Sequence, residues 1–194
     1  MRVIAGAAKG RRLQAPPGRA VRPTADRVKE ALFSIVQSRF ELVDATVLDL
    51  YAGTGALGIE GLSRGARRAV FVEQDHTARR VLAANLAACG FAVRARVLGT
   101  PVRRAVTDLA ARGERFDGVL MDPPYGQGLV DAALAQIAAV GVIEAGGWVA
   151  VEHGIDDVLA DVYGSLQLTT IRRYGKTAVA VFSNSHRAEE VAAQ

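Results

Sequence analysis

The sequence predicts an α/β fold built on a doubly wound, mostly parallel sheet, with helices on both faces and an antiparallel hairpin at the C-terminal end. Short apolar runs alternate with helical stretches along the chain, and this alternation is typical of a parallel sheet covered on both faces. The last two apolar runs have no helix between them, so we expect them to pair antiparallel. A glycine-rich loop follows the first run, where such sheets bind nucleotides.

The composition indicates a single domain. Half of the 194 residues are hydrophobic, which is enough for a sizeable core. No apolar run reaches the roughly 18 residues of a membrane span, and the start of the chain lacks a signal-peptide pattern, so we expect a cytoplasmic protein. Cys89 is the only cysteine and lies in an apolar stretch, which favours a small core residue. The histidines His76, His153 and His186 lack metal-ligand spacing, and no metal is expected.

Positive charge is concentrated at the start of the chain. Within the first thirty residues the only acids are Asp26 and Glu30, and glycines and prolines separate the basic residues. We expect residues 1–23 to form an irregular arm that meets phosphates, although a solvated terminus that only aids solubility would look the same. The basic residues of this stretch are Arg2, Lys9, Arg11, Arg12, Arg19, Arg22, Arg27 and Lys29.

The first regular element is a helix for which Thr24 is a suitable N-cap. Its apolar residues recur at helical spacing and would form one buried face. They are Val28, Ala31, Leu32, Ile35 and Val36.

Five apolar runs then predict the parallel strands, over residues 46–50, 69–73, 93–98, 118–122 and 148–152. Four helical stretches are interspersed with them, over residues 57–63, 77–88, 102–111 and 129–139.

The C-terminal part of the chain departs from this alternation. Residues 166–171 and 178–182 are two strand-like runs joined by a short turn, and they predict an antiparallel pair that closes one edge of the sheet. Residues 184–194 are polar and rich in alanine, so we expect a frayed tail. The folded domain would therefore span residues 24–183.

The loop at residues 49–58 reads D-L-Y-A-G-T-G-A-L-G and contains a G-x-G-x-x-G pattern. Its small residues would let the backbone approach a ligand closely. Glu73 at the end of the second strand can accept hydrogen bonds from both hydroxyls of a ribose. These features fit NAD and S-adenosylmethionine alike, but Asp49 at the strand tip would repel a pyrophosphate and attract the cationic amino-acid end of S-adenosylmethionine. The alternative is that the glycines only permit tight helix–strand packing.

Several further residues are candidates for the cofactor site. Gly53 and Gly55 lie in the loop itself, and Tyr51 and Gln74 are placed to flank a bound cofactor. After the third strand an acid or amide is expected to contact the adenine edge, yet the chain offers Gly-Thr-Pro. Thr100 or a backbone N–H is the candidate substitute.

A D-P-P-Y sequence follows the fourth apolar run. Asp122 adds a carboxylate acceptor, and Pro123 and Pro124 form a stiff turn without N–H groups, so their carbonyls are free to accept. Tyr125 adds a flat stacking surface. A planar ligand with an NH₂ group at its edge, such as a nucleobase, suits this set. The alternative is a strand that simply ends in a proline turn.

The two motifs together predict a reaction. The tips of the first and fourth strands would be neighbours across the switch point of the sheet, so a methyl donor and an exocyclic amine would meet there. Asp122 and the Pro123 carbonyl would accept the amine hydrogens while Tyr125 holds the base, and positioning would drive an in-line displacement. Glu152 and His153, at the end of the fifth strand, are interpreted as ordinary polar residues at the sheet edge.

A resemblance to a known family adds detail. The chain carries R-P-T at 22–24, D-R-V-K-E-A-L-F at 26–33, the glycine loop, D-P-P-Y, and Y-G at 174–175. It thereby resembles the bacterial 16S ribosomal RNA guanine-N2 methyltransferases of the type that modifies guanine 966. The resemblance implies a seven-stranded, Rossmann-like S-adenosylmethionine-dependent methyltransferase fold. It also implies a substrate guanine of 16S RNA in an assembling small ribosomal subunit.

Carried onto this sequence, the resemblance assigns Asp49, Gly53, Gly55 and Glu73 to the cofactor and residues 122–125 to the guanine. We expect a monomer. The residues expected to bind substrate are Arg2, Lys9, Arg11, Arg12, Arg19, Arg22, Pro124 and Tyr125.

Other functions fit part of the pattern. An adenine or cytosine amino-methyltransferase of DNA or RNA shares both motifs, although the DNA enzymes normally carry a base-reading insertion for which this chain has no room. A nucleotide-dependent oxidoreductase would not explain D-P-P-Y or the basic arm. A non-catalytic RNA-binding assembly factor needs only the arm.

Overall fold

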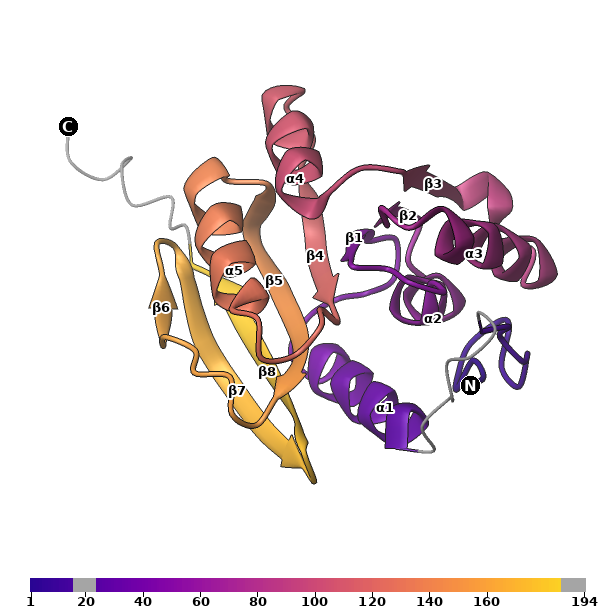
Figure 1. Cartoon of the computed structure of the whole chain (residues 1–194), viewed down its shortest axis with the longest axis horizontal. Helices are drawn as coiled ribbons and strands as arrows, with labels where there is room; N and C mark the ends of the chain where they lie inside the picture. The colour runs from indigo at the N-terminus through magenta and orange to yellow at the C-terminus, as the bar shows by residue number, and fades with distance from the viewer. Residues whose placement is uncertain (16–23, 186–194) are drawn as a thin grey trace.

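The computed structural model describes residues 1–15 and 24–185, which form an eight-stranded sheet with the order β3-β2-β1-β4-β5-β8-β7-β6 (Figure 1). The parallel strands are β1 (Thr46–Leu50), β2 (Arg68–Val72), β3 (Ala95–Leu98), β4 (Phe116–Met121) and β5 (Ile143–Gly154). The antiparallel strands are β6 (Val162–Tyr163), β7 (Leu166–Tyr174) and β8 (Thr177–Asn184). The α/β fold with its C-terminal hairpin is confirmed, but the expected count of seven strands is wrong by one, because the two-residue β6 adds an outer edge.

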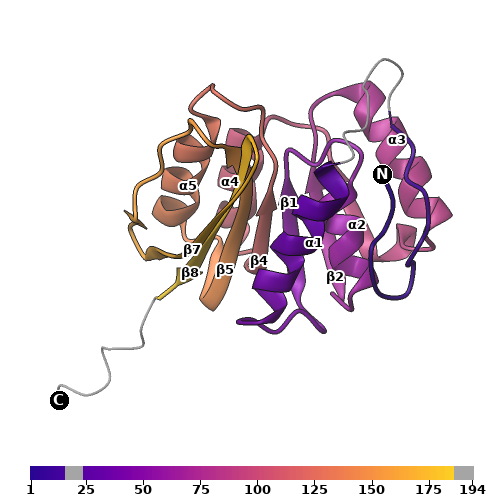
Figure 2. The ribbon, with the colours of Figure 1, turned by 90° about the horizontal axis from the view of Figure 1, so that it is seen from below.

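Helices cover both faces of the sheet. One core cluster joins the sheet to α1 (Thr24–Gln37), α2 (Ala56–Ser63) and α3 (His76–Ala88). A second cluster on the other face joins it to α4 (Val102–Ala111) and α5 (Leu129–Val140). Figure 2 shows the two groups on either side of the strands. Every helix of the described part of the chain is too short or too polar to cross a bilayer.

Some boundaries differ from those expected. A short 3-10 helix, Ala92–Arg94, takes the start of the third expected strand. β5 begins at Ile143, before the expected run, and β8 continues through Asn184. The tail was expected to begin at residue 184, which is too early, since Asn184 still belongs to β8. Its buried side chain donates to the carbonyls of Ile143 and Glu144 at 3.2 and 3.0 Å. Residues 186–194 lie outside the described part of the chain.

The N-terminal segment, residues 1–15, is folded onto the domain. Arg2 and Arg12 form an antiparallel bridge, so the segment doubles back on itself. Val3, Ala8 and Leu13 are buried in the same core cluster as α1 and α2. The expected irregular arm is thus packed on the domain over residues 1–15, where its apolar side chains and backbone have partners, and its contact with phosphates stays a prediction.

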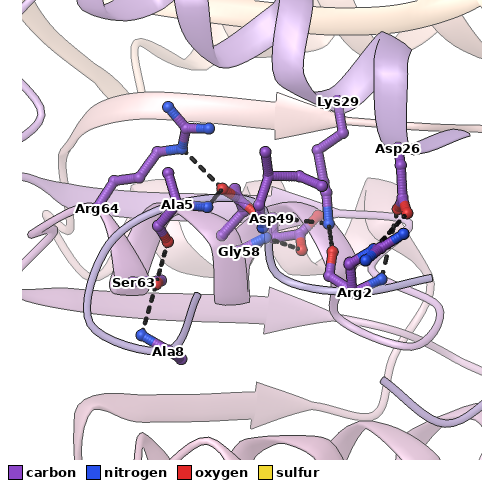
Figure 3. Close-up of polar contacts among 11 residues, drawn as sticks. Arg2, Ala5, Ala8, Asp26, Lys29, Asp49, Gly58, Ser63 and Arg64 are labelled. Carbon is purple, nitrogen blue, oxygen red and sulfur yellow. Dashed lines mark hydrogen bonds and ion pairs between the residues drawn. The ribbon is translucent and has the colours of Figure 1, made fainter. Parts of the chain in front are cut away.

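Glu60 of α2 holds this segment in place, and Figure 3 labels its partners Ala5, Lys29 and Arg64. Its carboxylate is completely buried and accepts hydrogen bonds from the backbone N–H groups of Ile4 at 2.8 Å and Ala5 at 3.0 Å. Lys29 of α1 and Arg64 supply the opposite charge, with N···O distances of 3.3 and 2.8 Å. Burial lowers the pKa of Lys29, and the Glu60 carboxylate opposes that shift. Three separate stretches of chain thus meet at one buried carboxylate.

Ser63, one turn after Glu60, adds a second attachment. Its hydroxyl accepts from the Ala8 N–H at 3.0 Å and donates to the Ala5 carbonyl, and its own carbonyl accepts from Ala7 N–H at 2.8 Å. The backbone of the segment is therefore fixed by hydrogen bonds to the last turn of α2, in addition to the apolar contacts.

Replacing Glu60 by alanine should destabilise the fold strongly. The change leaves Lys29 buried without its carboxylate and two backbone N–H groups without acceptors, which we expect to lower the free energy of unfolding by roughly 3–5 kcal/mol. Urea unfolding measures the effect. Glu114→Ala, which breaks the partly exposed pair with Arg96, is the control and should cost at most about 1 kcal/mol. Equal losses in the two variants would contradict the role given to Glu60.

Candidate active site at the switch point of the sheet

The strand order reverses between β1 and β4, which places the carboxyl ends of these two parallel strands side by side. Leu50 pairs with Met121, so the residues that follow, Tyr51 and Asp122, leave the sheet next to each other. Open α/β sheets bind their ligands at such a reversal. The glycine loop and D-P-P-Y, which are far apart in the sequence, therefore meet at one site.

The glycine loop has a backbone shape that glycine permits. Gly53 and Gly55 have φ angles of 54° and 83°, and Tyr51 has a φ of 60°, which costs a non-glycine residue about 1–2 kcal/mol. Such strain gathers at ligand-binding sites. A Cβ on Gly53 would meet nothing nearer than a backbone oxygen at 3.9 Å. The loop thus keeps open space beside Gly53, which suits the close approach of a ligand.

Gly58 has a different role. A Cβ at this position would lie 2.3 Å from the Phe71 ring and 2.9 Å from a carboxylate oxygen of Asp49. The packing interpretation of the glycines is therefore right for Gly58, where α2 must approach β1 and β2 closely. It does not account for the open space at Gly53.

Asp49 lies under the loop, and only 1% of its surface is exposed. Its Oδ2 accepts the Gly58 N–H at 2.8 Å. Burial raises the pKa of Asp49 to about 7, with a smaller contribution from the charge of Glu73 and an opposing one from the Gly58 hydrogen bond. A cation brought to this place would favour the ionised carboxylate.

Glu73 follows β2 directly and organises the neighbouring backbone. Its Oε2 accepts the Gly53 N–H at 2.9 Å and its Oε1 accepts the Asp75 N–H at 2.7 Å. The residue is half-buried. Each carboxylate oxygen has a second lone pair, so the pair of hydroxyls of a ribose still finds acceptors here. The residues at the tips of β1 and β2 thus fit a nucleoside with a cationic tail.

The far edge of this region contains a residue that sequence reasoning missed. Arg79 of α3 donates from one guanidinium nitrogen to the carbonyls of Glu73 and Gln74, at 3.2 and 2.6 Å. Gly99 packs against the same guanidinium, since a Cβ there would lie 2.9 Å from its Cζ. Gln74 is exposed and Thr100 is half-buried beside Gly99. The glycine after β3 was the available signal, because it makes room for a long side chain from α3.

The D-P-P-Y turn places its four residues in different environments. Asp122 and Pro124 are exposed, Pro123 is buried and Tyr125 is half-buried. The Tyr125 hydroxyl donates to Glu152 Oε1 at 2.9 Å. Burial and the charges of Glu152 and Asp122 raise the pKa of Tyr125, so its ring stays a neutral phenol near pH 7. The expectation that Glu152 is an ordinary edge residue is therefore wrong, since it fixes the tyrosine of the motif.

Asp157 stiffens the same turn and was also missed. Its two carboxylate oxygens accept the N–H groups of Gly126 at 3.0 Å and Gly154 at 2.9 Å. Tyr125 in turn packs on Gly154, where a Cβ would lie 3.3 Å from that of the tyrosine. The D-P-P-Y turn is thus tied to the end of β5, and the motif alone does not reveal these partners. His153, at the same strand end, is 1% exposed and points its Nδ1 at the Gly154 carbonyl.

Asn85 of α3 connects the glycine loop to the N-terminal segment. Its side chain is buried, accepts the Gln14 N–H at 2.8 Å and donates to the carbonyls of Gln14 and Thr54 at 3.1 and 3.0 Å. One amide therefore bonds both to the end of the segment and to the middle of the loop. An asparagine in the middle of a helix is a weak signal, and no motif included it.

The basic residues of the segment divide into three groups. Lys9, Arg11 and Arg12 are exposed. Arg2 pairs with Asp26 at 3.6 Å. Arg19 and Arg22 lie outside the described residues. Within residues 1–15 and 24–185, no group of three His, Cys, Asp or Glu side chains is arranged to hold a metal ion.

Comparisons with known proteins cover nearly the whole chain. The family model described as Conserved hypothetical protein 95 matches residues 1–183. The chain is 37% identical to "Putative rRNA methyltransferase YlbH" of Bacillus subtilis, over 94% of this chain and 98% of that protein. It is 33% identical to "Ribosomal RNA small subunit methyltransferase D" of Escherichia coli K12, over 97% and 92%. A solved structure, "Putative methyltransferase yhhF from Escherichia coli", superposes with a TM-score of 0.82 at 33% identity, covering 96% and 99% of the two chains.

Asp49→Asn should change how stability depends on pH. The folded pKa of about 7 exceeds the unfolded value near 3.9, so the native state holds this proton longer. The stability that this protonated carboxyl contributes is fully present below about pH 4 and is lost as pH rises through about 7. Urea unfolding should show that the free energy of unfolding of the parent protein falls between pH 4 and pH 8. In the variant this fall should be smaller, by on the order of a few kcal/mol. Identical profiles would contradict the buried proton.

Proposed function

We propose, from the premise that this chain belongs to the Conserved hypothetical protein 95 family, that it methylates an exocyclic amine of ribosomal RNA with S-adenosylmethionine. The observation that carries the proposal is the meeting of two chemically different motifs at the switch point between β1 and β4. The tips of β1 and β2 fit a nucleoside with a cationic tail. The tip of β4 fits the edge of a base.

The cofactor assignment rests on the donor set. Glu73 would accept the ribose hydroxyls, Asp49 would favour the cationic amino-acid end through its charge, and Gly53 leaves the space for close approach. Tyr51, Gly55, Gln74 and Thr100 complete the proposed lining. When bound, S-adenosylmethionine supplies an electrophilic methyl group.

Asp122, Pro123 and Tyr125 would act on the base. An exocyclic amine is a weak nucleophile because its lone pair is delocalised into the ring. Acceptance of its hydrogens by the Asp122 carboxylate and the Pro123 carbonyl would direct the lone pair out of the ring plane toward the methyl group. Tyr125, fixed by Glu152 and Gly154, would hold the ring by stacking. The raised pKa keeps the Tyr125 hydroxyl protonated near pH 7, so Tyr125 would position the base, and the proton lost from the methylated amine would pass to Asp122 or to water.

The substrate is the finer part of the proposal. The relatives are named as ribosomal RNA methyltransferases, one of them of the small subunit. We extend this to the N2 amine of a guanine in 16S RNA, with guanine 966 as the candidate, within an assembling small subunit in the cytoplasm. Such a base must be unpaired or flipped out to reach Asp122. The exposed cations of the N-terminal segment would bind the surrounding phosphates, with the protein acting as a monomer.

Asp122→Ala should abolish methyl transfer, with a loss of at least about 100-fold in kcat, because one of the two amine acceptors is removed. Binding of S-adenosylmethionine, measured by calorimetry, should persist. Asp161→Ala is the matched control, since Asp161 is an exposed acid outside the site. A fully active Asp122 variant would refute the assignment.

Incubation with labelled S-adenosylmethionine and either free 16S RNA or small subunits, followed by nucleoside analysis, should yield N2-methylguanine. Label on adenine or cytosine would favour the amino-methyltransferase alternative. RNA binding with no label from either substrate would favour a non-catalytic assembly factor.

Replacing Arg11 and Arg12 together by glutamine should weaken RNA binding and flatten its salt dependence. Each lost phosphate contact should lower the slope of log K against log salt by about 0.7–0.9. Fluorescence anisotropy over a salt series measures this. Arg103→Gln on α4 with Arg112→Gln at its C-cap, on the opposite face of the sheet, removes the same charge and should leave the slope unchanged.

A further inference from the structure

The end of β7 and the turn into β8 carry a second group of exposed cations. Arg172, Arg173 and Lys176 lie within five residues of one another and are all exposed. Among the described residues none of their side chains has an ion pair or a hydrogen bond, whereas Arg2, Arg64 and others are paired with acids. This group, the hairpin cations, is absent from both motifs.

The turn adjoins the D-P-P-Y site. Thr177, the first residue of β8, has its hydroxyl 3.5 Å from the Tyr125 hydroxyl, and the Lys176 carbonyl accepts the Ile155 N–H at 3.3 Å. Ile155 follows Gly154, on which Tyr125 packs. The hairpin cations are therefore next to the residues that fix the proposed base-binding tyrosine.

Strand register separates the two arginines. Arg172 pairs with Val179, which pairs in turn with Glu152 of β5, so these three residues lie side by side on one face. Val179 belongs to the core cluster of α1 and α2. Arg173 pairs instead with Ala178, and successive residues of a strand point to opposite faces. Arg172 is thus on the Tyr125–Glu152 side of the sheet, and Arg173 is on the other.

The surroundings of Arg172 favour a phosphate as its binding partner. Two strand spacings, about 10 Å, separate its backbone from that of Glu152, and no described acid is paired with it. Arginine readily binds phosphate through its planar guanidinium. Arg172 is therefore suited to a phosphate next to the target nucleotide. The base itself would be bound at Asp122.

The N-terminal segment and the hairpin lie on different sides of the site. Figure 1 shows the segment beyond α2, the β7–β8 turn at the far side, and α1 between them. Each side presents unpaired cations, Arg11 and Arg12 on one and Arg172 and Lys176 on the other. An RNA strand whose target base entered at Asp122 would therefore meet positive charge on both flanks.

We propose that Arg172, together with Lys176, binds backbone phosphates of the RNA strand that presents the target base, on the flank opposite the N-terminal segment. This inference rests on the proposed function and adds a second phosphate-binding surface to it. Arg173 takes no part, because it projects from the other face.

The test compares Arg172→Gln with Arg173→Gln, which remove equal charge at adjacent exposed positions. In steady-state methylation of the RNA substrate, Arg172→Gln should raise KM about 3- to 10-fold with kcat unchanged, and the affinity for S-adenosylmethionine should not change. Its salt slope for RNA binding should fall by about one phosphate contact. Arg173→Gln should match the parent protein, and Arg172→Lys should recover part of the affinity.

Three outcomes would overturn the inference. They are an unchanged KM and salt slope in Arg172→Gln, equal effects in Arg172→Gln and Arg173→Gln, and a fall in kcat without a change in KM. Direct RNA binding by anisotropy is measured on the same variants. If the parent protein methylates no RNA, the proposed function fails, while the difference in RNA binding between the two variants still decides the inference about the hairpin.

Discussion

A buried carboxylate must be surrounded by donors, and in this protein that requirement at Glu60 brings three parts of the chain together. Its partners come from the N-terminal segment, from α1 and from the end of α2. The glycine loop leads directly into α2. The same eight-residue helix therefore starts at the proposed cofactor site and, near its end, holds the basic segment proposed to meet RNA.

The D-P-P-Y turn and the glycine loop are held in position by side chains outside both motifs. The tyrosine of D-P-P-Y is fixed by Glu152, and its turn is tied down by Asp157, both near the end of β5. The glycine loop is held by Glu73 and Asn85 from two further elements. Each motif supplies reactive atoms at a strand tip, and the neighbouring elements set their positions.

Sequence reasoning succeeded where a regular rule connects residues to space. Alternating apolar runs predicted the parallel sheet, and the carboxyl ends of adjacent parallel strands must share an edge, so the adjacency of the β1 and β4 ends was predictable. The family model and relatives confirm the resemblance seen in the motifs. Contacts such as that of Glu60 with Ile4 join irregular backbone to one helix face, and no sequence pattern predicts them. The buried residues Val3, Ala8 and Leu13 follow neither helical nor strand spacing, so their burial was not predictable either. The adenine contact at Thr100 stays a prediction.

The attachment of the N-terminal segment also orders events during synthesis. Ile4 bonds to Glu60, Ala8 to Ser63 and Gln14 to Asn85, across 55 to 71 residues of chain. The segment precedes α2 and α3 in the chain, so these contacts cannot all form until the residues of α3 have been synthesised. Because Asn85 also bonds to Thr54, the segment and the glycine loop share one side-chain partner, and loss of that side chain would remove a contact from both.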